Sequence, residues 1–182
     1  MLSLLLRIRS QWFGRLLAVG RSISTLFNEF VTSSKGERPA AMWRAGRAAD
    51  QDFQPEHDLY YRLKPHWVQG AEVCVPQHNP PFDLPAFSVN WSKYSRPEWV
   101  LIPPADKPDV AYKGFSVAAI KVGHLPAVGD FSLRAEHRPE EDNYSHSEVT
   151  CFDSDAEVRK PPRSDRMKLR DSLARKARVL PS

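Results

Sequence analysis

The chain has 182 residues, of which 41% are hydrophobic and 26% charged, and this length is typical of one domain with extensions. The net charge of +4 conceals two basic ends around an acidic middle. Residues 1–28 contain four arginines and no acid, residues 159–182 have a net charge of +7, and residues 29–158 have a net charge of −7. Any anion-binding function that depends on excess positive charge is therefore expected at the ends.

The sequence lacks the motifs that are typical of several common function classes. The sequence contains no GxxxxGK[ST], GxGxxG, GxSxG or HExxH motif, which excludes the common nucleotide-binding and hydrolase patterns. Cys74 and Cys151 are far apart and form no CxxC pair, so a structural zinc site is not indicated. The sequence assigns no cofactor and no metal.

Residues 1–30 predict a basic amphipathic helix. Its apolar face includes Leu16 and its opposite face includes Arg15, but it lacks the roughly 18 consecutive apolar residues of a transmembrane helix. Three interpretations stay open: docking on the domain or on a second copy, binding to a membrane surface, and a mitochondrial transit peptide. We expect a protein partner or self-association through this helix, and a cytoplasmic protein unless residues 1–30 are a mitochondrial transit peptide.

Short β-like segments cut by proline and glycine occupy residues 51–158, after a small, polar linker over residues 31–50. The segments are residues 58–63, 71–75, 86–94, 99–102, 112–123, 130–137 and 144–152. Phe87, Val89 and Trp91 alternate with polar residues, and this two-residue period is typical of a half-buried strand.

These segments predict a mainly β (α+β) fold. We expect a small antiparallel sheet, barrel or bent-sheet domain over residues 51–158, flanked by the N-terminal amphipathic helix and a basic C-terminal helix or tail. The tail, residues 159–182, has a thin apolar stripe that includes Leu169 and Leu173, and Asp171 and Arg175 have the spacing of a helical ion pair. It either docks on the acidic middle or contacts a nucleic acid or an anionic lipid surface.

The segment "HRPEEDNYSHSEV", residues 137–149, is the first candidate site. Residues 130–137 and 144–152 predict a hairpin, in which His146 and Glu148 share a face and His137 lies across from the start of the second strand. His137, His146 and Glu148 are therefore candidate catalytic residues, as general acid and base, and could also offer three ligands to a metal. The alternative is a solvated polar hairpin at the edge of a sheet.

A second candidate site lies in "NWSKYSRPEW", residues 90–99, where Lys93 and Arg96 could bind an anion at a sharp corner between two apolar segments. The alternative is a structural corner without a ligand.

The leading functional hypothesis is a small intracellular β-rich interaction or ligand-binding module with basic helical ends for docking or assembly. A small hydrolase or metal-dependent enzyme that uses the His/His/Glu cluster is one alternative, and a nucleic-acid-binding accessory protein is another. The residues leave open whether the chain is an enzyme.

Overall fold

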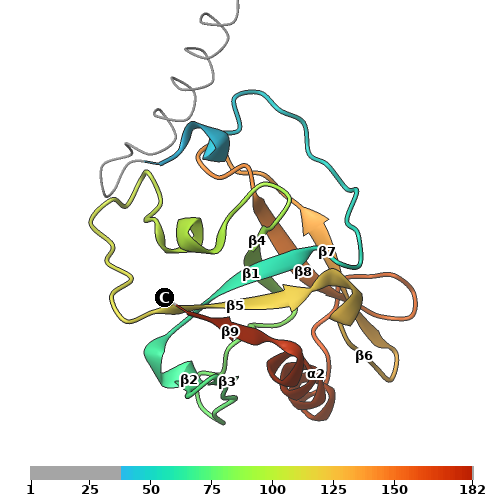
Figure 1. Cartoon of the computed structure of the whole chain (residues 1–182). Helices are drawn as coiled ribbons and strands as arrows, with labels where there is room; N and C mark the ends of the chain where they lie inside the picture. The colour runs from blue at the N-terminus through green and yellow to red at the C-terminus, as the bar shows by residue number, and fades with distance from the viewer. Residues whose placement is uncertain (1–37, 182) are drawn as a thin grey trace, which may run out of the picture. The chain divides into compact units, whose positions relative to one another are not determined.

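Residues 38–181 are described by a computed structural model (Figure 1). The helix predicted over residues 1–30 and the first part of the predicted linker lie outside the described residues. From Ala40 onward the chain forms a single unit.

A seven-stranded antiparallel sheet is the centre of the described region, with the strand order β6-β7-β8-β4-β1-β5-β9. The strands are β1 (Asp58–Leu63), β4 (Ala86–Trp91), β5 (Ser116–Lys121), β6 (Ala127–Val128), β7 (Phe131–His137), β8 (His146–Phe152) and β9 (Arg178–Leu180). The sheet curls into a half-barrel, as Figure 1 shows. The prediction of a mainly β fold is confirmed, and among the three predicted architectures the bent sheet is the one that forms.

The side chains on the concave face of the sheet make the main core. In the register of the sheet, Leu59 of β1 lies opposite both Trp91 of β4 and Ile120 of β5, so these three side chains share one face. Val149 of β8 lies opposite Phe87 of β4 on the same side. All five are buried, and the alternation seen in the sequence of β4 corresponds to this inward face.

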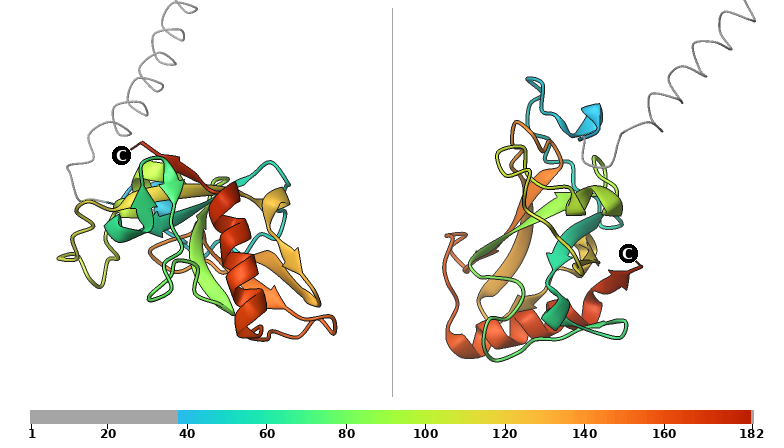
Figure 2. Two further views of the ribbon diagram at one scale, coloured as in Figure 1. Left: turned by 90° about the horizontal axis from the view of Figure 1, so that it is seen from below. Right: turned by 90° about the vertical axis from the view of Figure 1, so that its left-hand side faces the viewer.

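Helix α2 (Arg163–Lys176) crosses the core side of the sheet, as the left view of Figure 2 shows. Leu169 and Leu173 are one turn apart on this helix, and both are fully buried in the core cluster. The predicted basic C-terminal helix is therefore present and packs on the sheet, and the chain then continues into β9. No helix among residues 38–181 combines the length and the apolar character needed to cross a membrane.

The segment predicted as a strand over residues 99–102 is instead part of a 3-10 helix, η3 (Pro97–Leu101). Pro97 stands at the first helical position, where its fixed φ suits a helical turn and its missing N–H has no partner to lose. Val100 is buried, and its carbonyl accepts a hydrogen bond from Arg62 Nε at 3.1 Å. The apolar segment is thus buried by packing a short helix on β1, which short apolar runs allow as readily as a strand.

Three further 3-10 helices and a two-stranded hairpin complete the described elements. The hairpin pairs β2 (Val68–Gln69) with β3 (Glu72–Val73) and follows η2 (Pro65–Trp67). The other 3-10 helices are η1 (Ala40–Met42) and η4 (Val122–His124).

The described end of the predicted linker is attached to the β7–β8 end of the sheet. The backbone N–H of Arg44 donates to Glu141 O at 2.8 Å, and the N–H of Tyr144 donates to Met42 O. The side-chain amide of Gln51 donates to His137 O at 3.0 Å, and its oxygen accepts from the His137 backbone N–H at 3.2 Å. These bonds hold residues 42–51 as a strap over the hairpin.

Replacing Leu173 with alanine should lower the free energy of unfolding by about 2–5 kcal/mol, because a fully buried leucine is removed from the contact between α2 and the sheet. Met167→Ala on the same helix is the matched control, since Met167 is 47% exposed, and it should change the stability by no more than about 0.5 kcal/mol. Urea unfolding followed by circular dichroism measures both values. Similar small losses in both variants would contradict the packing of α2 in the core.

Candidate functional site

The register of the β7–β8 hairpin separates the three predicted catalytic residues. His137 lies opposite Ser147, and Glu136 lies opposite Glu148. Because successive side chains of a strand point to opposite faces, His137 faces the core side, while His146 and Glu148 face the other side. His137 is buried at 2% exposure, and the structure does not bring it together with the other two.

His137 is held by contacts that use both ring nitrogens. Its Nδ1 accepts a hydrogen bond from the Asp50 backbone N–H at 2.9 Å, and its Nε2 contacts the carbonyl oxygen of Tyr144. Since a carbonyl oxygen can only accept, Nε2 carries the proton and the ring is neutral. The ring also packs against Trp91 and Tyr94. His137 therefore joins the strap to the hairpin, with neither ring nitrogen left for acid–base chemistry.

His146 and Glu148 belong to a polar network around Arg138. His146 Nδ1 is 2.6 Å from the Arg138 carbonyl oxygen and donates to it, while His146 Nε2 is 3.7 Å from a Glu140 carboxylate oxygen. Arg138 lies 3.2 Å from Glu148 and 2.8 Å from Glu136. An acid–base function of His146 with a carboxylate stays a prediction, now without His137 as a third member.

The second predicted site places Lys93 between two carboxylates. Lys93 Nζ is 2.8 Å from Asp50 Oδ2 and 3.3 Å from Asp52 Oδ2, and Tyr94 OH donates to the same Asp50 oxygen. The hydrogen bonds from Lys93 and Tyr94 hold the pKa of Asp50 well below its ordinary value. Arg96 lies over the ring of Trp99, with its guanidinium carbon 5.8 Å from the ring centroid. An anion would have to compete with two carboxylates for Lys93, and anion binding by Lys93 and Arg96 stays a prediction.

Residues 38–181 contain no group of three or more His, Cys, Asp or Glu side chains placed to hold a metal ion. Both cysteines are free thiols, Cys74 half-buried and Cys151 buried. Burial raises the pKa of Cys151 to about 11, so this thiol is protonated and unreactive at neutral pH.

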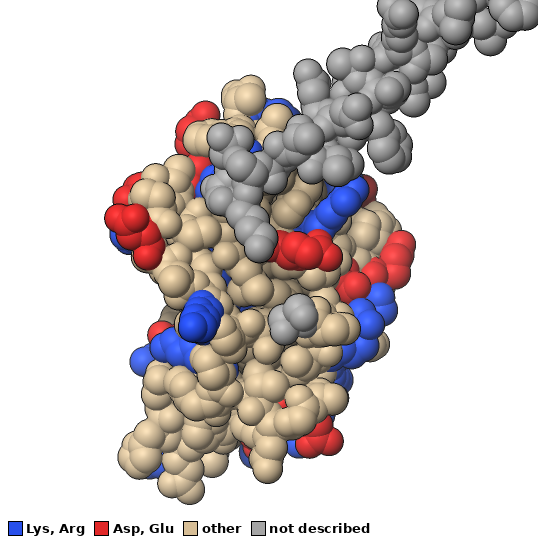
Figure 3. Space-filling view, turned by 60° about the vertical axis from the view of Figure 1, so that its left-hand side comes forward, with Lys and Arg blue, Asp and Glu red and all other residues tan. Residues whose placement is uncertain are grey.

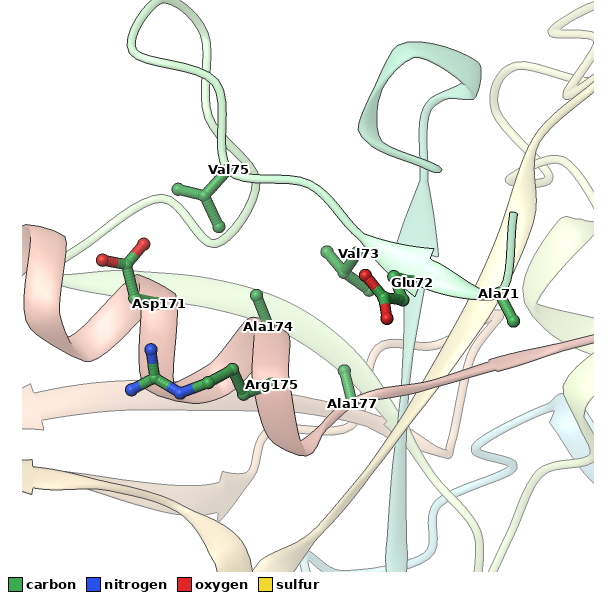
Figure 4. Close-up of a pocket in the computed structure, with 8 residues that line it drawn as sticks. All are labelled: Ala71, Glu72, Val73, Val75, Asp171, Ala174, Arg175 and Ala177. Atoms are coloured by element: carbon green, nitrogen blue, oxygen red, sulfur yellow. The ribbon is translucent and has the colours of Figure 1, made fainter. Parts of the chain in front are cut away.

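A pocket of about 390 Å³ lies between α2 and the β2–β3 hairpin, and Figure 4 shows it with its lining residues. We call it the α2–β3 pocket. Its apolar lining comes from Ala71, Val73, Val75, Ala174 and Ala177. Its charged lining comes from Glu72 on β3 and from Asp171 and Arg175 on α2.

The pocket forms because one face of α2 is anchored in the core while the neighbouring face carries only small side chains. Leu169 and Leu173 fix the helix in the core. Ala174 and Ala177 lie beside this buried stripe, and their single methyl groups leave space between the helix and Val73. A larger side chain at position 174 would fill this space.

The three charged side chains of the pocket are free to meet a ligand. Among the residues that the structure describes, no ion pair or side-chain hydrogen bond engages Glu72, Asp171 or Arg175. Asp171 and Arg175 have the spacing of an ion pair, as predicted, but no ion pair joins them in the described structure. Four neighbouring basic residues do bind acceptors in the described structure: Lys168, Arg170, Lys176 and Arg178.

The sequence predicted a strand over residues 71–75 and an apolar stripe on the C-terminal segment, but it gave no sign that these two would face each other. The contact joins parts of the chain that are about a hundred residues apart. The pairing of small alanines with valines is the only local signal, and it is equally typical of ordinary helix packing.

Replacing His137 with alanine should lower the free energy of unfolding by about 2–4 kcal/mol, because the Asp50 N–H and the Tyr144 carbonyl lose their buried partner. The exposed His124, changed to alanine, is the control and should cost no more than about 0.5 kcal/mol. Urea unfolding at neutral pH provides both values. An unfolding free energy of His137→Ala within 0.5 kcal/mol of the wild type, roughly the size of a surface effect, would show that the strap is held in some other way.

Acid should reduce the advantage of the wild type over Asp50→Asn. A carboxyl whose pKa is lowered on folding contributes stability above its unfolded pKa, and this contribution is lost as the pH falls through the folded value. The two stabilities should therefore differ most at neutral pH and converge as the pH falls below about 3.9, the usual aspartate value. Urea unfolding between pH 7 and pH 2 tests this, with the exposed Asp130→Asn as control. A gap that is constant with pH would contradict the role of the Asp50 carboxylate.

The chain was compared with protein-family models, curated proteins and solved structures. No family model, no curated protein and no solved structure matches it. Its function is therefore argued from the geometry of its own residues, since a fold alone does not specify a function.

Proposed function

We propose that the unit described from Ala40 is a β-rich ligand-binding module whose binding site is the α2–β3 pocket. The observation that carries this proposal is a cavity of about 390 Å³ that is lined by alanines and valines together with three charged side chains, which are unpaired in the described structure. Ligand pockets combine apolar side chains with a few polar or charged groups that fix the orientation of the ligand.

The position of the pocket also supports this function. One wall is helix α2, which is fixed by two leucines buried in the core, and the other is the β2–β3 hairpin. Val73 of the hairpin belongs to the same core cluster as the two leucines, so the backbone of both walls is anchored.

The charge of the C-terminal segment gives less support to the nucleic-acid alternative. Arg159, Arg170 and Arg178 form ion pairs with Asp153, Asp83 and Asp58, which belong to the acidic middle of the chain. On the described part of the face in Figure 3, basic side chains lie beside acidic ones instead of forming a continuous basic surface. Binding to a phosphate backbone depends on such a surface.

Docking or assembly through residues 1–30 remains part of the proposal, although these residues lie outside the described region. In this proposal the terminal segment attaches the protein to its partner, and the folded unit binds the ligand. The enzymatic alternative has less support, because His137 is separated from His146 and Glu148.

The proposal predicts that small molecules bind in the pocket and that Ala174→Trp prevents this binding, because the indole fills the space beside Val73. A screen of neutral, anionic, cationic and zwitterionic fragments by ligand-observed NMR finds the binders, and amide shifts of the labelled protein locate them. Met167→Trp is the control, since it places the same indole at an exposed position of the same helix. If no fragment shifts the amides of the pocket, or if Ala174→Trp binds as the wild type does, the proposal is wrong.

A further inference from the structure

The pocket presents charges of both signs around an apolar floor. Asp171 and Arg175 are four residues apart on α2, so their side chains leave the helix on the same side, with Cβ atoms about 5–6 Å apart. Figure 4 shows both side chains on the helix wall of the pocket, with Glu72 on the hairpin wall. A ligand between the walls therefore meets one guanidinium and two carboxylates.

This charge pattern selects among ligand classes. A neutral apolar molecule would pair with none of the three charged groups, which are exposed, so these groups would add nothing to its affinity. A simple anion would pair with Arg175 but be repelled by the two carboxylates, and a simple cation would be repelled by Arg175. A molecule with both an ammonium and a carboxylate group satisfies both signs.

The hydrogen-bonding geometry of the groups fits the same class. The planar guanidinium of Arg175 can bind a carboxylate through two parallel N–H donors. An ammonium group has three donors and no acceptor, so it can pair with the Asp171 carboxylate, which lies on the same helix wall as Arg175. The remaining apolar part of such a ligand would lie on Val73 and Ala174.

The size of the pocket sets the size of the ligand. A volume of about 390 Å³ is near the lower end of the roughly 300–1,000 Å³ that is usual for ligand pockets. It suits a single small metabolite better than a dinucleotide or another large cofactor.

We propose that the α2–β3 pocket binds a free α-amino acid with an apolar side chain, its carboxylate paired with Arg175 and its ammonium with Asp171. This inference rests on the proposed ligand-binding function and names the ligand class of the same site. The apolar side chain packs on the valine and alanine lining and contributes the hydrophobic part of the affinity.

The experiment uses the full chain and two probe amino acids, L-leucine and L-phenylalanine. Each is compared with the analogue that lacks the amine and with the analogue that lacks the carboxylate: 4-methylpentanoate and 3-methylbutylamine for leucine, 3-phenylpropanoate and 2-phenylethylamine for phenylalanine. Titrations followed by amide shifts should show that at least one amino acid binds in the pocket at least tenfold more tightly than either of its analogues.

Charge-neutral variants assign each contact. Arg175→Gln should weaken amino-acid binding at least tenfold and reduce the preference over the amine analogue. Asp171→Asn should reduce the preference over the carboxylate analogue. Lys168→Gln is the control on the same helix, because Lys168 pairs with Asp165 and lies outside the pocket lining, and it should bind as the wild type does.

The outcomes separate this inference from the proposed function. If fragments of another charge class bind in the pocket and are blocked by Ala174→Trp, while neither amino acid binds, the ligand class is wrong and the ligand-binding function stands. The ligand class is also wrong if an amino acid binds no more tightly than its analogues, or if Arg175→Gln has no effect on its affinity. If no probe of any class binds, both proposals fail.

Discussion

The contact between α2 and the concave face of the sheet is the interaction on which the rest of the structure depends. A half-barrel leaves one apolar face open to water, and Leu169 and Leu173 cover it. The same contact fixes the direction in which the chain leaves the helix, so that Arg178–Leu180 can extend the sheet beside β5. It also sets the helix face that lines the pocket. The core, the edge strand β9 and the candidate site therefore all depend on the packing of α2 against the sheet.

Much of the fold could be predicted because the alternation of apolar and polar residues is a local property. Residues 58–63 form β1 as predicted, and Phe87, Val89 and Trp91 face the core together. Local patterns fail where packing decides the outcome. The apolar residues 99–102 contain no signal that separates a strand from a short helix, and Pro97 favours the helix. The two-residue strands β2 and β6 are too short to show any period.

The candidate pocket could not be predicted for a different reason. Its two walls are about a hundred residues apart in the chain, and each wall alone has the composition of an ordinary element. Asp171 and Arg175 have the spacing of a solvated ion pair, and only the approach of the hairpin makes them groups that line a cavity. Sites built between distant elements need the tertiary structure, whereas a site within one hairpin requires only its register.

The register is why the His/His/Glu site does not form as predicted. His137 and Ser147 lie opposite each other, and a shift of one residue would have placed His137 opposite His146, with both rings on one face. The loop between the strands sets this register, and the bridge between Glu140 and Asn143 shows that the loop has a turn of its own. The loop sequence contains residues that are typical of turns, but it does not specify how many residues lie outside the paired strands. Burial then stabilises the observed register, because it places the neutral ring of His137 between the strap and Tyr144 and leaves the charged Glu148 and Arg138 on the outer face.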